Sequence, residues 1–87
     1  MAVARGYQRI TALVSSTALT VPGSATYAVI VARKLVRWRD DGTAVTADAG
    51  MLLVPNQYFE YKGPLSAIRF IQVDPAAELD ISYYSDT

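Results

Sequence analysis

Short apolar segments alternate along the chain with clusters of Gly, Pro, Ser, Asn and Asp. No segment keeps the 3.6-residue periodicity of an amphipathic helix, and this alternation is typical of an all-β domain. The pattern predicts about eight short antiparallel strands, arranged as a compact β-sandwich of jelly-roll-like type. The expected strands are Tyr7–Val14, Ala18–Val21, Tyr27–Ala32, Leu35–Arg39, Met51–Val54, Tyr58–Lys62, Leu65–Val73 and Leu79–Tyr84.

Two of these segments also predict their own surroundings. Tyr27–Ala32 is almost continuously apolar, so we expect a central strand that is covered on both faces. Leu79–Tyr84 alternates, which places Leu79, Ile81 and Tyr83 inward and Asp80, Ser82 and Tyr84 outward, or the two tyrosines the other way round if the edge is covered. We find no internal repeat and no linker, and therefore expect a single domain over residues 1–87, with 1–6 and 85–87 as flexible ends.

The composition is unusually apolar for so short a chain. Of the 87 residues, 52% are hydrophobic and 18% are charged, and no Cys is present to form a disulfide. A small domain has much surface for little interior, so part of this apolar content is expected outside the core. Contiguous exposed apolar surface usually marks an interface, which predicts association with other copies or other proteins.

The charges balance to a formal net charge of zero. This argues against nucleic acid or an anionic membrane surface as a partner, because both attract strongly basic proteins. No apolar run approaches the length of a membrane span, and the first six residues are too short for a signal peptide. We expect synthesis in a cytoplasm.

The chain offers little material for catalysis. It has neither His nor Cys, and it lacks the serine motifs that activate a nucleophile in other ways. Asp40, Asp41 and Asp48 could bind a metal through oxygen, but their spacing differs from a calcium-binding loop, and a solvated turn is the favoured interpretation. We therefore predict no enzyme activity, no catalytic residue, no metal site and no cofactor.

The densest group of distinctive side chains is the run from Arg37 to Gly42. Strand alternation places Trp38 on one face, with Val36, and places Arg37 and Arg39 on the other. Because Trp38 shares its face with Val36, we expect it to anchor the core. The arginines could pair with Asp40, Asp41 or Glu60, or they could contact another subunit, since Trp and Arg dominate binding hot spots.

Arg69 stands inside an apolar segment, between Ile68 and Phe70. A charge in such a place must be paired or must reach the surface. Two alternatives remain open: an ion pair with an acid of the Arg37–Asp41 segment, and a salt bridge across a subunit boundary. The residues expected at an interface are thus Arg37, Arg39, Arg69, Tyr58 and Tyr84.

Several motifs together resemble a family of small phage and prophage proteins encoded among virion structural genes. Its most specific parts are Arg-Trp-Arg-Asp-Asp-Gly-Thr at 37–43 and Leu-Ser-Ala-Ile-Arg-Phe-Ile at 65–71. The likeness runs from about Ala18 to Tyr84 and also includes Ala18–Pro22, Gly50-Met51, Tyr61 and Tyr83-Tyr84. The sequence departs from the family pattern at Val45, where a proline is common, and in the more basic Arg33-Lys34.

The resemblance implies a β-sandwich in the virion, on the head or at the head–tail junction, made in the bacterial host cytoplasm. It supplies no catalytic residues. The leading hypothesis is therefore a structural or decoration protein that associates with itself and with other virion proteins. The alternative is a module that binds carbohydrate or a host surface, with Trp38 or the tyrosines exposed in a concave site.

Overall fold

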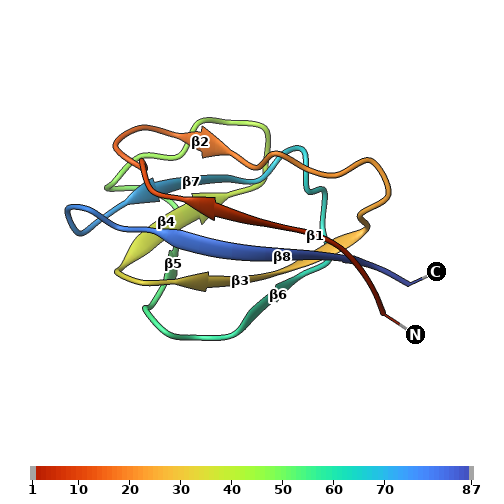
Figure 1. Ribbon diagram of the computed structural model, residues 1–87. Coiled ribbons are helices and arrows are strands. Elements are labelled where there is room, and N and C mark those ends of the chain that lie inside the picture. Colours follow the sequence, from red (N-terminus) through yellow and green to blue (C-terminus); the bar gives the residue numbers. More distant parts are fainter. Residues whose placement is uncertain (1, 87) are drawn as a thin grey trace.

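The computed structural model describes residues 2–86, which form eight β-strands and no helix (Figure 1). The all-β class and the number of strands predicted from the sequence are confirmed. The strands are β1 (Val3–Ile10), β2 (Thr17–Ala18), β3 (Tyr27–Ala32), β4 (Val36–Arg39), β5 (Met51–Leu53), β6 (Phe59–Tyr61), β7 (Arg69–Gln72) and β8 (Leu79–Ser85).

Strands from the first half of the chain pair with strands from the second half in nested order. β1 pairs with β8, β2 with β7, β3 with β6 and β4 with β5, all antiparallel. Two further pairings, β3 with β8 and β4 with β7, complete two four-stranded sheets. We call these the β8 sheet (β1-β8-β3-β6) and the β7 sheet (β2-β7-β4-β5). The first and last strands are partners, so Val3 near the start of the described chain lies opposite Ser85 near its end (Figure 1).

The core lies between the two sheets. Each strand turns one face inward, and each large apolar side chain that is buried there contributes about 1.5–3 kcal/mol. The connecting segments add buried side chains of their own, which close the sandwich at its ends. The core cluster consists of Ile10, Leu13, Leu19, Ala28, Ile30, Ala32, Val36, Leu53, Tyr61, Leu65, Ile68, Phe70, Ala77, Leu79, Ile81 and Tyr83.

β8 is the strand whose sequence pattern predicts its environment best. Leu79, Ile81 and Tyr83 are buried, as the alternation predicts, while the residues between them are half-buried on the outer face. The buried hydroxyl of Tyr83 donates to the side-chain oxygen of Gln8 at 2.6 Å, which satisfies it inside the sandwich. Burial raises the pKa of Tyr83 to about 12.

β3 is central, as predicted, but only one of its faces is covered by another layer. Ala28, Ile30 and Ala32 point into the core and are completely buried. Val29 and Val31 point outward and are half-buried. The prediction of cover on both faces is therefore wrong, because a two-layer sandwich has no third layer.

The first strand begins earlier than its apolar pattern predicts. It was expected at Tyr7–Val14, but β1 begins at Val3, because pairing with β8 holds Val3 opposite Ser85. Residues 3–6 and the buried Ser85 thus belong to strands, within the segments 1–6 and 85–87 that the sequence predicts as flexible ends. Residues 1 and 87 lie outside the described residues.

Two other strands differ clearly from their predicted segments. β2 is Thr17–Ala18, where Ala18–Val21 is predicted, and β7 begins at Arg69 although the apolar run begins at Leu65. Leu65 and Ile68 are nevertheless buried, since the turn before β7 folds back onto the core. An apolar residue in a turn and one in a strand look alike in the sequence, so the burial was foreseeable and the strand boundary was not.

Leu13 and Val14 are neighbours in the segment between β1 and β2, and they provide a matched test of this core. Leu13 is completely buried, whereas Val14 is 76% exposed. We expect Leu13→Ala to lower the free energy of unfolding by about 2–5 kcal/mol, because it leaves a cavity. Val14→Ala should change it by no more than about 0.5 kcal/mol. Urea unfolding of both variants measures this difference, and equal effects would contradict the burial of Leu13.

Candidate functional site

The outer face of the β7 sheet gathers the three arginines that the sequence marks for an interface. Arg39 in β4 lies directly opposite Arg69 in β7. Trp38 and Phe70 form the adjacent pair and belong to the opposite face, because strand side chains alternate. Arg37 lies two residues before Arg39 and therefore shares its face. The pairing of two strands distant in sequence brings these arginines together.

The polar partners of these arginines differ from one another. Arg39 forms an ion pair with Asp41, with 3.2 Å between Nε and Oδ1, as one of the alternatives predicts. Arg37 instead donates to the carbonyl oxygens of Ala47 and Gly50, at 2.8 and 3.0 Å. This correction has a simple cause: the loop after β4 returns over the sheet and presents its backbone to Arg37.

Arg69 also binds carbonyl oxygens, those of Ser66 at 2.8 Å and Ile68 at 3.1 Å. The ion pair expected with the Arg37–Asp41 segment is not formed within residues 2–86, although Arg39 is directly across the strand pair. Asp41 is instead engaged by Arg39 and by the backbone N–H of Thr43. The arginines therefore bring positive charge to this face, and among the described residues only Arg39 is balanced by a carboxylate.

Aliphatic side chains surround the arginines on the same face. Arg37 lies between Ile71 in β7 and Leu52 in β5. Leu52 is 52% exposed. Val54 lies two residues further along, and therefore on the same face, and is 46% exposed. The outer face of the β7 sheet is thus a mixed surface of cations and uncovered apolar groups.

Tyr58 and Tyr84, the other two residues predicted at an interface, lie elsewhere. Tyr84 is half-buried on the outer face of the β8 sheet, where its ring stacks on Tyr27 with 5.5 Å between centroids. Tyr58 immediately precedes β6 and is 70% exposed. The five predicted residues therefore do not form one site, because sequence reasoning had no means of assigning strands to sheets.

Trp38 contacts the core but does not lie fully within it. It is half-buried, and its ring packs against Phe59 and Tyr61 of the facing sheet, at centroid distances of 5.2 and 6.0 Å. Trp38, which the sequence predicts to anchor the core, thus packs against the core and leaves the outer edge of its indole exposed. That edge borders an open pocket of about 530 Å³.

Backbone and polar groups complete this pocket, which we call the Trp38 pocket. Its lining is Trp38, Arg39, Asp40, Asp41, Gly50 and Met51. Asp40 accepts a hydrogen bond from the Tyr61 hydroxyl at 2.7 Å. Burial, together with this bond to a carboxylate, holds the pKa of Tyr61 well above its usual range.

Gly50 shapes the same pocket, since the loop can return to β4 only with a residue that has no side chain. Its φ of 145° disfavours other residues. A Cβ there would lie 2.8 Å from a methyl group of Val45 and 3.0 Å from the carbonyl oxygen of Trp38. The residues around the pocket thus include one aromatic residue, two aspartates and an arginine. Within residues 2–86 no group of three acidic residues gathers to hold a metal.

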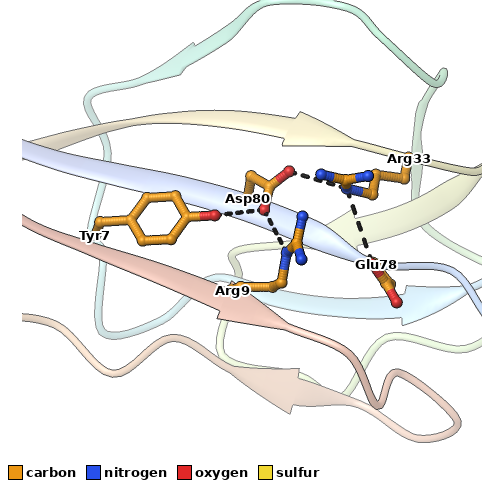
Figure 2. Close-up of polar contacts among 5 residues, drawn as sticks. All are labelled: Tyr7, Arg9, Arg33, Glu78 and Asp80. Carbon is orange, nitrogen blue, oxygen red and sulfur yellow. Dashed lines mark hydrogen bonds and ion pairs between the residues drawn. The ribbon is translucent and has the colours of Figure 1, made fainter.

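A second polar cluster, which the sequence analysis missed, lies on the outer face of the β8 sheet (Figure 2). Asp80 in β8 accepts hydrogen bonds from the Tyr7 hydroxyl at 2.7 Å, Arg9 Nε at 3.0 Å and Arg33 Nε at 3.1 Å. Arg33 also lies 3.8 Å from a carboxylate oxygen of Glu78. These bonds tie β1, β8 and the end of β3 together from outside. Alternation predicted only that Asp80 points outward.

The cluster has a clear electrostatic consequence. The hydrogen bond from Tyr7 has the largest effect on Asp80, and those from Arg9 and Arg33 act in the same direction. Together they outweigh partial burial and lower the pKa of Asp80 to about 2. Donors around a carboxylate favour its charged form in this way.

Comparison with known proteins does not identify the chain. No family model, no curated protein and no solved structure matches it. Among the described residues, no helix is long and apolar enough to cross a membrane.

Asp80 should make stability depend on pH in the acidic range. Its pKa is lower in the folded protein than in the unfolded chain, so the ionised form stabilises the fold above its ordinary pKa. This stabilisation is lost as the pH falls from about 4 towards 2. We expect the free energy of unfolding to fall less steeply over this range in Asp80→Asn than in the parent, measured by urea unfolding at successive pH values. Asp48→Asn, at an exposed loop position, should keep the parent's slope; identical slopes in all three proteins would refute the role of Asp80.

Proposed function

We propose that this chain is a non-enzymatic structural subunit of a bacteriophage or prophage particle, made in the host cytoplasm. In this proposal it associates with itself and with other virion proteins, as a head decoration or head–tail component. The observation that carries self-association is the uncovered apolar edge of the β7 sheet. Met51, Leu52 and Val54 are 61%, 52% and 46% exposed there, in and beside one edge strand.

The neighbouring arginines support the same proposal. An interface needs orienting polar groups beside its apolar centre, and Arg is enriched at such positions. Within the described part of the chain, Arg37 and Arg69 are held by carbonyl oxygens rather than by carboxylates, so their charge is available to an acidic group of another protein.

The strand order adds support by analogy. The nested pairing of β1 with β8, β2 with β7, β3 with β6 and β4 with β5 suits a jelly roll, a fold used in viral capsids and in lectins. A fold hosts many functions, so the particle itself is proposed from the Arg37–Thr43 and Leu65–Ile71 motifs. The proposal of no enzyme activity rests on the lack of His and Cys.

Mass in solution tests self-association. We expect light scattering at micromolar concentration to give a defined multiple of the 9.5 kDa chain mass, because apolar edge groups are removed from water on association. A specific interface of standard size buries about 800 Å² on each partner, against 4818 Å² of surface on this chain. A single monomeric species throughout this range would contradict the proposal. Detection of the chain by antibody in purified particles tests its location separately.

The Trp38 pocket favours a second candidate function, the binding of carbohydrate. Sugar rings stack on aromatic surfaces, and their hydroxyl groups bond to carboxylates and guanidinium groups such as Asp40, Asp41 and Arg39. Pockets that bind small ligands combine an apolar wall with a few polar groups in this way. The half-buried indole with this polar lining is the observation that supports this candidate.

The chain has one tryptophan, so its fluorescence reports directly on the pocket. If the second candidate is right, a saccharide found on a glycan array will shift the Trp38 emission. Asp40→Asn, which removes the charge of a lining carboxylate, should weaken that binding by about tenfold or more, because hydrogen bonds to charged groups are worth about 1.5–3 kcal/mol. Tyr58→Phe, at an exposed position outside the pocket lining, serves as the control. An array without hits, or a saccharide that leaves the emission unchanged, would reject this candidate.

A further inference from the structure

The two sheets have four edges, and three of them carry features that discourage pairing with another chain. β1 carries Arg5 and Arg9, and its pairing is irregular between Ala4 and Gly6. β6 contains Glu60 and is followed by Lys62. β2 is only two residues long. Charges, irregular pairing and shortness are the usual means by which proteins protect a sheet edge.

β5, the fourth edge, carries no charge at all. No charged residue occurs anywhere from Gly50 to Phe59. In the described part of the chain, β5 pairs only with β4, so the backbone groups on its other side are free for another strand. Its exposed side chains, Met51 and Leu52, are apolar, and so is Val54 directly after it.

We propose that β5 pairs with β5 of a second copy of this chain, antiparallel about a two-fold axis that passes beside Leu52. The two β7 sheets then join into one continuous eight-stranded sheet. This inference rests on the proposed self-association and specifies the surface that performs it.

The proposed register is compatible with the faces of both sheets. With Leu52 opposite the partner's Leu52, Met51 lies opposite the partner's Leu53. Since Leu53 is part of the core, Met51 would extend the apolar interior across the junction. On the outer face, the two Leu52 side chains would cover each other, and each Val54 would lie opposite the partner's Gly50.

Charge favours a second copy over an unrelated partner. A two-fold axis places identical residues close together, so a charged residue at the junction would be repelled by the same residue of the partner. β5 and the two-residue β2 are the edges without charged residues, and β5 is the longer of the two. The nearest arginine, Arg37, lies one strand away in β4, which places the two Arg37 backbones roughly 14 Å apart across the junction. That distance exceeds the Debye length of about 8 Å at physiological salt.

An introduced thiol tests the register directly, because the chain has no Cys. Opposed residues of an antiparallel pair have Cα atoms about 4.5–5.5 Å apart, which suits a disulfide. We expect Leu52→Cys to form a covalent dimer rapidly under mild oxidation. Val14→Cys is the matched control, since Val14 is 76% exposed but lies far from β5 in the chain. It should cross-link at least about tenfold more slowly, through random collisions only.

A charge at the same position tests the energetics. Leu52→Lys places two ammonium groups face to face across the two-fold axis, and should weaken self-association on the order of a hundredfold. Val14→Lys, the same kind of change at a more exposed site, should leave association unchanged. Circular dichroism of both variants should match the parent, because Leu52 is half exposed and supports no core contact.

The outcomes separate this inference from the proposed function. If the parent self-associates but Leu52→Lys has the parent's mass and Leu52→Cys reacts no faster than Val14→Cys, the β5 pairing is wrong while self-association stands. If the parent is monomeric throughout the micromolar range, self-association fails and the β5 pairing fails with it. Rapid cross-linking at Leu52, together with dissociation by the lysine, supports the pairing.

Discussion

A sandwich of two sheets can hide only one face of each strand, and this limit governs the whole molecule. More than half of the residues are hydrophobic, and the space between the sheets holds only part of them. The remainder, such as Val29 and Val31 on β3 and Leu52 on β5, occupy outer faces. Function is therefore to be sought on the outside of the sheets.

The two outer faces deal with this excess differently. On the β8 sheet, Asp80 and its donors form a polar network over three strands, and Tyr84 stacks on Tyr27. In these contacts, polar groups and aromatic rings of that face bind one another within the chain. Among residues 2–86 the β7 sheet has no comparable network, because Arg37 and Arg69 are held by backbone carbonyls and the apolar side chains beside them remain uncovered. This contrast makes the β7 sheet the better candidate for an interface.

The loop between β4 and β5 connects the two candidate sites, which are the outer face of the β7 sheet and the Trp38 pocket. Arg37 holds the loop from the outer face, while Gly50 lets it pass close to the Trp38 carbonyl. The same loop and its neighbours line the Trp38 pocket. A change in this loop would therefore affect both the pocket and β5.

The sequence by itself determined the all-β class, most of the strand positions and the inward face of β8, because alternation and turn residues act over a few positions. It also indicated surplus apolar surface, and it identified arginines that the fold gathers on one face. Only the tertiary structure decided that Arg39 lies opposite Arg69, that Asp80 collects three donors, and that Trp38 borders a pocket. It also decided that β1 extends back to Val3 and that β5 is an edge. The physical reason is that these features arise from pairing between strands far apart in the chain, and local patterns contain no information about which strands will meet.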